Sequence, residues 1–304
     1  MKAFLVSLFV VLCPWNAQSQ DVQIENELGT FHAHWKRAAS GAVVVIIPGS
    51  GTVDRFGNSG SVKGNNLLYL SDSLQSRGIS VLSTDKLSAI ESKPINIDSL
   101  TYDSFVALAN EWVDVAKDSG YSKIYVLGHS QGSLTALILG NHRDDLAGVI
   151  SLCGAGQPIQ EILKVQLGTQ FPPEQMDGIS LALDSVAMGE SPKSPSPFLN
   201  GLFNPSQYPF LKSWMDYDPC IFAAQINCPL LILSGENDIQ VPVSEGELLH
   251  NCNPASQNIV IPGMGHMLKK SVKLRVLALQ HYGNAELPVI HELPETIEAF
   301  IESN

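Results

Sequence analysis

The segment Gly-His-Ser-Gln-Gly at residues 128–132 holds a serine with a glycine two positions away on either side. An apolar run at 124–127 precedes it, and a helix-like stretch follows at 133–139. This order predicts a strand, a sharp turn and a helix, with the turn lifting the hydroxyl of Ser130 out of the sheet. The glycines are needed because a Cβ would collide where the chain folds back so sharply. Ser130 is therefore our candidate nucleophile for attack on a substrate carbonyl.

A serine nucleophile needs a base to take its proton and an acid to orient that base. Asp238 is the candidate acid, because it follows a buried-type strand at 229–233 and comes shortly before a Val-Pro pair. His266 is the candidate base, because it follows a strand at 258–261 and a glycine-rich turn that leaves the backbone free to place the ring. Catalytic groups of open α/β sheets gather at the carboxyl ends of strands, so we expect both residues near Ser130.

Other acids and histidines have less favourable contexts. Glu236 and Asp218 are weaker candidates for the acid. His129 lies beside the nucleophile and is expected to point away from it. His32 and His34 could share a strand face as a metal pair, but no third ligand is evident in the sequence. Four further histidines lie on predicted helices or late loops and are expected to be solvated or packed: His142, His250, His281 and His291. We predict no metal site and no cofactor.

Two backbone N–H groups should stabilise the oxyanion of a tetrahedral intermediate. One belongs to Gln131, the residue after the nucleophile, and the other to the loop after the apolar strand at 42–47. In that loop, at 48–58, Ser50 is our first choice for the donor and Gly51 the second. The loop is rich in glycine, but it contains neither G-x-x-x-x-G-K-[ST] nor G-x-G-x-x-G, which argues against a phosphate cradle.

Apolar runs and helical patterns alternate along most of the chain, which predicts an α/β protein with a mainly parallel, doubly wound sheet. Strands are expected at 22–35 (a hairpin), 42–47, 79–82, 123–127, 147–153, 229–233 and 258–261. Helices are expected at 65–77, 102–119 and 294–301. There are no internal repeats.

Residues 157–214 interrupt this alternation of strands and helices. They contain helical pieces and a Pro/Ser run at 191–197, but no strong strand. So long an interruption is usually functional, and we interpret it as a mostly helical cap inserted over the sheet. The α/β core would then comprise 20–156 and 215–304. Five aromatic residues of the cap could line an apolar pocket or form the core of the cap: Phe198, Phe203, Tyr208, Phe210 and Trp214.

Residues 1–19 resemble a secretory signal peptide. Lys2 supplies the positive start, the apolar stretch at 3–12 is too short to span a bilayer, and the small-x-small pattern at 17–19 predicts cleavage before Gln20. The alternative is an uncleaved anchor or a buried first helix. We expect a periplasmic or extracellular protein with no stable membrane insertion after cleavage.

Four cysteines would remain after cleavage: Cys153, Cys220, Cys228 and Cys252. Export permits disulfides, and Cys220 and Cys228 are close enough in sequence to pair, but four cysteines allow three full pairings. No C-x-x-C occurs, which argues against structural zinc.

The composition excludes two classes of partner. The 304 residues are 44% hydrophobic and 16% charged, as in a well-buried globular protein. The formal net charge is −12, and no basic cluster exceeds the pairs at 36–37 and 269–270, so binding to nucleic acid or to anionic membranes is not expected.

Together these motifs resemble the α/β-hydrolase-fold serine esterases, in particular bacterial carboxylesterases with a P-G-S-G-x-x-D-R-x-G-N loop. The matching stretches lie at 48–58, 128–132, 235–242 and 263–266, and Tyr-Asp-Pro at 217–219 is similar too. The resemblance implies the fold, the chain order of serine, acid and histidine, and hydrolysis of carboxylic esters of small molecules, with the cap shaping the acyl or alcohol pocket.

The resemblance also implies that Asp54, Arg55 and Asn58 brace the loop rather than take part in the chemistry. One segment departs from the family pattern. Where many relatives carry Asp-(Lys/Arg)-Arg-Gly, this chain has Asp-Lys-Leu-Ser at 85–88, so that side of the pocket is expected to have a different shape.

The expected reaction is acyl transfer from a short or medium-chain ester to Ser130 and then to water. A serine aminopeptidase or acyl-peptide hydrolase is the alternative, because the same catalytic groups cleave amides. The cap acids Glu161, Glu174 and Glu190 could then anchor a substrate amine. A catalytically inactive binding protein is a third hypothesis. The sequence leaves the natural ester, the acyl chain length and the oligomeric state open.

Overall fold

The computed structural model describes residues 19–60, 62–89, 91–94, 96 and 100–304. The expected signal peptide lies outside these residues, apart from Ser19, which begins the first strand. Among the described residues, no helix combines the length and apolar character that a membrane span requires.

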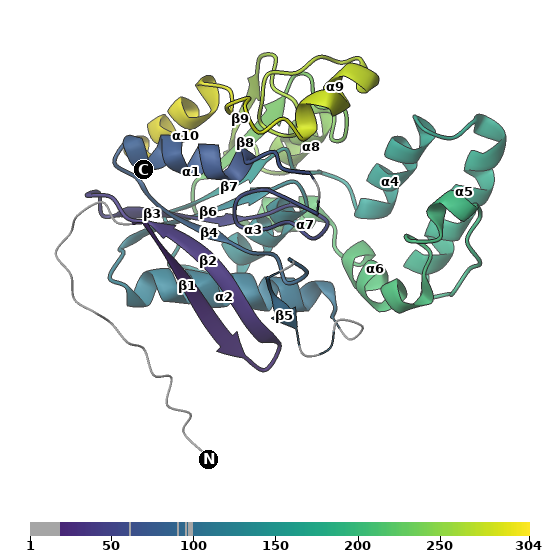
Figure 1. Cartoon of the computed structure of the whole chain (residues 1–304), viewed down its shortest axis with the longest axis horizontal. Coiled ribbons are helices and arrows are strands. Elements are labelled where there is room, and N and C mark those ends of the chain that lie inside the picture. Colours follow the sequence, from purple (N-terminus) through teal and green to yellow (C-terminus); the bar gives the residue numbers. More distant parts are fainter. Residues whose placement is uncertain (1–18, 61, 90, 95, 97–99) are drawn as a thin grey trace.

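Across the described residues the sheet has nine strands and is mainly parallel, as predicted (Figure 1). The strands run in the order β1-β2-β4-β3-β6-β7-β8-β9, and β5 pairs with β2. Strands β4, β3, β6, β7, β8 and β9 are parallel to one another, while β2 is antiparallel to both β1 and β4. The strands are β1 Ser19–Asn26, β2 Gly29–Lys36, β3 Ala42–Ile47, β4 Ser80–Thr84, β5 Lys93–Pro94, β6 Lys123–His129, β7 Gly148–Leu152, β8 Leu230–Gly235 and β9 Gln257–Ile261.

Helices cover both faces of the sheet, which explains why the central strand β3 is apolar and buried at every position. On β3, Val43 and Val45 belong to one hydrophobic core and Val44 and Ile46 to the other, because successive side chains point to opposite faces. The first core includes residues of α2 (Tyr102–Asp118), α3 (Gln131–His142), α7 (Pro219–Gln225) and α8 (Val243–Cys252). The second includes residues of α1 (Asn66–Ser76) and α10 (Glu292–Ser303), which lie together on the opposite side of the sheet from α2 (Figure 1).

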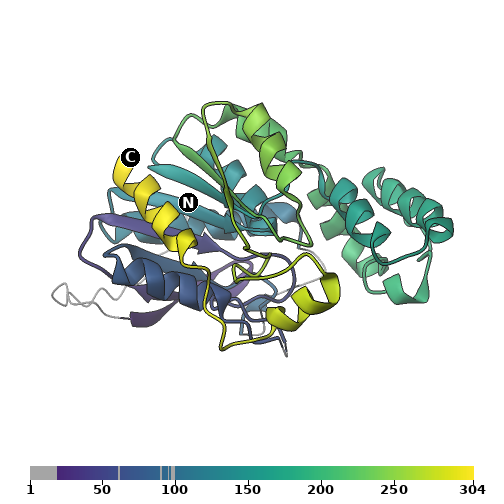
Figure 2. The same cartoon turned by 90° about the horizontal axis from the view of Figure 1, so that it is seen from above.

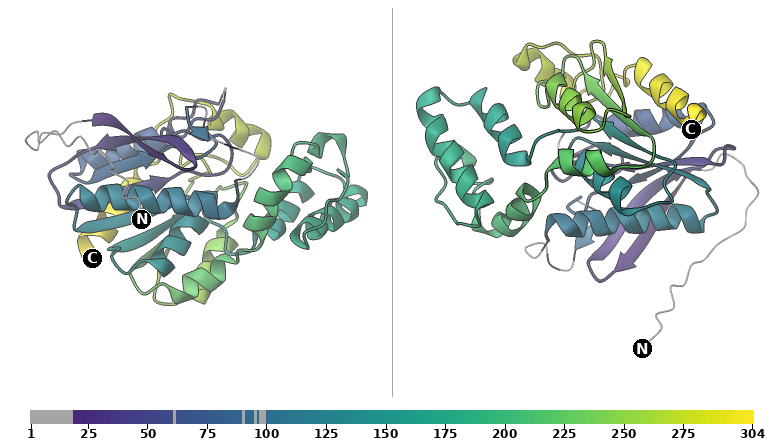
Figure 3. Two further views of the ribbon diagram at one scale, coloured as in Figure 1. Left: turned by 90° about the horizontal axis from the view of Figure 1, so that it is seen from below. Right: turned by 180° about the vertical axis from the view of Figure 1, so that it is seen from behind.

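The segment interpreted as a cap is helical, and its described residues form no strand. It contains α4 (Ile159–Gly168), α5 (Pro173–Ala187), the 3₁₀ turns η2 (Pro197–Leu199) and η3 (Pro205–Gln207), and α6 (Tyr208–Met215). These helices project to one side of the core rather than lying flat across the sheet (Figures 1 to 3). They enclose a hydrophobic cluster of their own, which includes residues of α4, α5 and α6.

The aromatic residues of this segment have three different environments. Phe203 and Tyr208 are buried in its own cluster, whereas Phe198 is 90% exposed. Phe210 and Trp214 pack against the ring of Tyr102 at the start of α2, with ring centroids 6.4 and 5.9 Å away. This contact joins α6 to the helix layer of the core.

One disulfide joins Cys220 of α7 to Cys252 at the end of α8. The pairing of Cys220 with Cys228, which their short separation suggested, does not form, because α7 packs against α8 and brings Cys252 to a Cα–Cα distance of 5.6 Å. Cys153 and Cys228 are free.

Candidate active site

Ser130 occupies the sharp turn between β6 and α3, as its motif predicts. Its backbone has φ 54° and ψ −118°, a conformation that residues other than glycine rarely adopt. Both flanking glycines are required by close backbone approaches. A Cβ on Gly128 would lie 2.0 Å from the carbonyl oxygen of Gly132, and one on Gly132 would lie 2.4 Å from that of Ile47. The turn therefore holds the serine in a strained backbone at the carboxyl end of the sheet.

The structure brings the three side chains predicted from the sequence into one hydrogen-bonded chain. The Nε2 atom of His266 lies 3.0 Å from Oγ of Ser130, and its Nδ1 atom lies 2.7 Å from Oδ2 of Asp238. Because an ionised carboxylate only accepts hydrogen bonds, Nδ1 of His266 carries the proton. Nε2 is then free to accept the proton of the serine hydroxyl. This is the arrangement of a nucleophile, a base and an orienting acid.

Asp238 is held in its charged form. Burial alone would raise the pKa of its carboxyl group, but the neighbouring His266 and two backbone N–H groups outweigh that effect and lower the pKa below its ordinary value. Its Oδ1 atom accepts hydrogen bonds from the backbone N–H groups of Gln240 at 2.8 Å and Val241 at 3.0 Å. Its side chain is fully buried.

The loops that carry Asp238 and His266 support each other. The backbone N–H of Asn237 donates to the carbonyl oxygen of Met264 at 2.8 Å, and its side-chain amide donates to the carbonyl oxygen of Ser271 at 2.7 Å. A Cβ on Gly235 would lie 2.5 Å from the Met264 carbonyl oxygen, so the end of β8 must be glycine for the loops to approach this closely.

The residues predicted for the oxyanion site lie beside the nucleophile. Gln131 begins α3, so its backbone N–H has the unpaired position typical of a helix N-terminus. A Cβ on Gly49 would lie 3.1 Å from the Cβ of Ser130, which brings the peptide between Gly49 and Ser50 close to the serine. Gly51, the second choice, follows in a left-handed conformation with φ 95° and is exposed.

The loop at 48–58 is braced by the residues that the family resemblance named. Oδ1 of Asp54 accepts hydrogen bonds from backbone N–H groups within the loop, including that of Asn58 at 2.8 Å. Asn58 exchanges two hydrogen bonds with Asn65. The backbone N–H and the guanidinium of Arg55 both bind the buried carboxylate of Asp85. The segment at 85–88 therefore supports this loop.

His129 is a contributor whose role the sequence did not reveal. It does not contact the nucleophile as a base, but its Nε2 atom lies 2.8 Å from the backbone carbonyl oxygen of His266. Burial and the nearby charge of His266 lower the pKa of His129 to about 4. The sequence signal for this separate role is that His129 ends a strand directly before Ser130. Because successive side chains of a strand point to opposite faces, its ring is not expected to point the same way as the serine hydroxyl.

The other acids and histidines that the sequence offered make contacts outside this hydrogen-bonded chain. Glu236 accepts a hydrogen bond from the backbone N–H of Gly263, and Asp218 caps α7 through the N–H of Cys220. His34 contacts Asp21 and Ser19 on the outer hairpin rather than forming a metal pair with His32. The other histidines named above have these contacts: His142 with the Phe222 ring, His250 with Ser256 and His291 with Glu295, while the buried Nδ1 of His281 has no hydrogen bond to any described residue.

Within the described ranges, one group of three potential metal ligands lies together: His129, Cys153 and His266 have ligand atoms within 4.8 Å of one another. Both nitrogens of His266 already have partners in the chain from Ser130 to Asp238. Burial and the charge of Asp238 raise the pKa of the Cys153 thiol, which opposes the thiolate that metals bind. The group fits a hydrogen-bond network better than a metal site.

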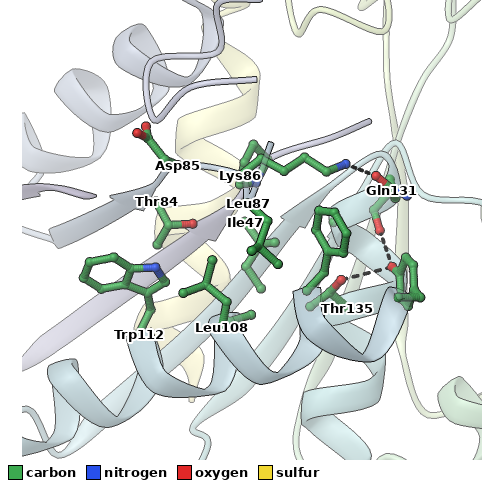
Figure 4. A pocket seen from close by; sticks show the side chains of 14 residues that line it. Ile47, Thr84, Asp85, Lys86, Leu87, Leu108, Trp112, Gln131 and Thr135 are labelled. Atoms are coloured by element: carbon green, nitrogen blue, oxygen red, sulfur yellow. Dashed lines mark hydrogen bonds between the residues drawn. The ribbon is translucent and has the colours of Figure 1, made fainter. Parts of the chain in front are cut away.

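Two cavities adjoin these elements. A small one of about 20 Å³ lies between the end of β4, α2 and α3, beside Gln131 (Figure 4). A larger one of about 230 Å³ lies between α4, the loop after Asp238 and α9 (Arg275–Tyr282). Its walls are Gln166, Gln170, Ile239, Gln240, Arg275 and Leu279.

Comparison with known proteins relates the chain to esterases. It is 28% identical to esterase EstD of Thermotoga maritima over 218 residues, which are 67% of this chain and 48% of that protein. The chain thus spans about half the length of this curated relative. No family model matches the chain.

Solved structures extend the likeness over almost the whole chain. An esterase of Pyrococcus furiosus superposes with a TM-score of 0.61 at 15% identity, covering 96% of this chain and 95% of that one. The esterase Est1E of Butyrivibrio proteoclasticus, solved with ferulic acid, has a TM-score of 0.61 at 18% identity, covering 90% of this chain and 95% of that one. Sheet order, helix layers and these neighbours agree that the chain has the α/β-hydrolase fold.

Proposed function

We propose that this protein hydrolyses carboxylic esters through an acyl-enzyme on Ser130. The observation that carries the proposal is the hydrogen-bonded chain from Ser130 through His266 to the buried carboxylate of Asp238. The likeness to esterases in sequence and in fold supports the same activity.

In the first half of the reaction, Ser130 attacks the ester carbonyl while Nε2 of His266 takes the hydroxyl proton. The charge that develops on the carbonyl oxygen is stabilised by the backbone N–H groups of Gln131 and Ser50. Asp238 stabilises the imidazolium and keeps its Nδ1 protonated. His266 then returns the proton to the leaving alcohol, and the acyl group stays on the serine.

In the second half, a water molecule repeats the sequence. His266 takes a proton from the water, the resulting hydroxide attacks the acyl carbonyl, and Ser130 leaves with its proton restored. This mechanism needs no metal and no cofactor.

We propose small esters with short or medium acyl chains as substrates. A candidate space for part of the substrate is the cavity of about 230 Å³ beside the loop that carries Asp238, although its walls do not include Ser130, His266 or Gln131. Ile239 and Leu279 offer an apolar wall, and three glutamines and Arg275 offer hydrogen bonds to oxygen atoms.

We further propose that the protein is exported after cleavage of the segment at 1–19. The disulfide between Cys220 and Cys252 is compatible with an oxidising compartment. N-terminal sequencing of the exported protein should begin at Gln20, and an intact Met1 would contradict cleavage.

The activity is tested with p-nitrophenyl acetate, butyrate and octanoate, together with an aminoacyl p-nitroanilide as the amide control. We expect turnover of the shorter esters and little turnover of the amide. Ser130→Ala should lose hydrolysis and labelling by a fluorophosphonate probe while its melting temperature stays close to that of the wild type. Faster turnover of the amide would favour a peptidase, and a wild-type protein that neither turns over nor labels would favour an inactive binding protein.

A further inference from the structure

Lys86 is a buried lysine that the proposed reaction does not use directly. It follows β4 and is 6% exposed. Figure 4 shows its side chain extended toward Gln131. Its Nζ atom donates to the backbone carbonyl oxygen of Gly49 at 2.8 Å and to Oε1 of Gln131. Lys86 therefore bridges Gly49, which precedes the donor residue Ser50, and Gln131, whose own backbone N–H is the other oxyanion donor.

The contact with Gly49 controls the direction of a neighbouring donor. The carbonyl of Gly49 and the N–H of Ser50 belong to one planar peptide group, and in a trans peptide they point in opposite directions. When Lys86 holds the carbonyl oxygen, the Ser50 N–H is turned to the other side of the peptide. Within the part of the chain that the structure describes, this N–H has no hydrogen-bond acceptor. It is available to a substrate oxygen.

The charge of Lys86 also acts on the strength of that donor. A cation at the carbonyl oxygen polarises the peptide group and makes its N–H a stronger donor, as in other hydrogen-bond chains of low dielectric surroundings. A donor that is strong and fixed before the reaction stabilises the developing oxyanion without reorganisation.

The contact with Gln131 fixes the first turn of α3. Because a lysine ammonium offers only donors, it must face the amide oxygen of Gln131. The backbone carbonyl oxygen of Gln131 is held separately by the hydroxyl of Tyr102 at 2.9 Å. The residue that presents the second oxyanion N–H is thus held by both its side chain and its backbone.

The burial of this ammonium is unfavourable for folding. Among the described residues, no carboxylate forms an ion pair with Lys86, and burial lowers the pKa of Lys86 to about 7. The charged form on which the polarisation depends therefore predominates below about pH 7, whereas the hydrogen bonds to Gly49 and Gln131 position both residues. The ring of Phe105, 5.0 Å from Nζ, offers some compensation. A charge held only by neutral oxygens and a ring adds little to stability, and what it contacts is the peptide that carries the Ser50 N–H and the side chain of Gln131.

We propose that Lys86 is a positioning residue of the oxyanion site, which aims and polarises the Ser50 N–H and anchors Gln131. This inference rests on the proposed function. Lys86 does not touch the substrate, so its removal should raise the energy of the transition state and leave substrate binding nearly unchanged.

The test compares Lys86→Met, Lys86→Arg and the matched control Lys36→Met. Lys36 is also buried (7% exposed), but it pairs with Asp72 away from Ser130. With p-nitrophenyl butyrate we expect Lys86→Met to lower kcat about 10- to 100-fold with KM changed less than about threefold, since loss of a whole oxyanion donor is worth about 10²–10³. Lys86→Arg should recover part of kcat, and Lys36→Met should retain it.

A trifluoromethyl ketone, which forms an oxyanion on the serine, provides a second measurement. Its inhibition constant should rise in Lys86→Met by about the same factor as kcat/KM falls. An unchanged kcat in Lys86→Met, or a lowered kcat with unchanged ketone inhibition, would overturn the inference. If Lys86→Met does not fold, Lys86→Gln undergoes the same two measurements. If the proposed function itself were wrong, the wild type would show no hydrolysis and no fluorophosphonate labelling. This outcome differs from a failure of the proposed role of Lys86, in which the wild type remains active.

Discussion

The Nε2 atom of His129 donates a hydrogen bond of 2.8 Å to the backbone carbonyl oxygen of His266. Because a carbonyl oxygen only accepts, the proton of the neutral ring must be on Nε2. His129 directly precedes Ser130 in the chain, so this contact ties the strand that presents the nucleophile to the loop that presents the base. The distance between the two reacting side chains thus depends on a third residue.

Replacing His129 should impair catalysis because it removes the hydrogen bond to the backbone carbonyl of His266. In His129→Leu the carbonyl of His266 loses its buried donor, and we expect kcat to fall about 10- to 100-fold, because small displacements of a catalytic group have effects of this size. His129→Gln retains an N–H donor and should stay closer to the wild type. Steady-state kinetics with p-nitrophenyl acetate measure both variants. Full kcat in His129→Leu would show that the contact does not position the base.

The same residue should make the folded protein sensitive to acid. Burial, together with the charge of His266, lowers the pKa of His129 from 6.5 to about 4 in the folded state. Between these values the unfolded chain binds the proton and the folded protein does not, so the free energy of unfolding falls as the pH drops from about 6.5 to about 4. The full effect is about 3 kcal/mol.

Denaturant unfolding of the wild type and His129→Gln at pH values within and above this range measures the effect. The wild type should lose more stability on acidification than the variant does. Parallel pH profiles for the two proteins would contradict a buried neutral imidazole at this position.

Asp238→Asn should abolish most of the activity without unfolding the protein. The amide has nearly the shape of the carboxylate, but it no longer requires a proton on Nδ1 of His266 and no longer stabilises the imidazolium. We expect kcat to fall about a thousandfold or more, as for the corresponding change in other serine hydrolases. Circular dichroism should show an unchanged fold. A loss of less than tenfold would indicate a different acid, and Glu236→Gln is the matched control.

Removal of the disulfide should destabilise the protein. The bond closes a loop of sequence separation 32 between Cys220 and Cys252, for which chain entropy predicts a loss of about 3–4 kcal/mol. The double variant Cys220→Ser/Cys252→Ser should therefore unfold at lower denaturant concentration, whereas Cys228→Ser, which removes a free thiol, should change less. Equal unfolding midpoints for the wild type and the double variant would mean that the link does not constrain the unfolded chain.

Much of the fold could be read from local patterns. The continuous apolar run of β3 reflects burial on both faces, and the glycines around Ser130 reflect close backbone approaches. Ser130, Asp238 and His266 could be selected because each follows a strand of the same sheet, and parallel strands place their carboxyl ends at one edge. The ends of most predicted elements agree with the structure to within a few residues.

The contacts that support the site could not be read in this way. Lys86 meets Gly49 and Gln131 because β4, β3 and β6, which are distant in sequence, lie side by side in the sheet. His129 at the end of β6 meets the loop after β9, although β7 and β8 lie between these two strands. Sequence spacing suggested a bond between Cys220 and Cys228, but the packing of α7 on α8 decides the pairing. The two-residue strand β5 is too short to leave a periodic pattern.

The helical segment at 157–214 has its own hydrophobic cluster and departs from the α/β core between β7 and α7. None of the three residues that form the hydrogen-bonded relay lies in it. Because these three residues stand on the α/β core, a change in the length of the insertion would leave their scaffold in place. Such a change would have to keep the contacts that hold the insertion to the core, among them the stacking of Trp214 on Tyr102 and the hydrogen bonds between Gln157 and Glu245.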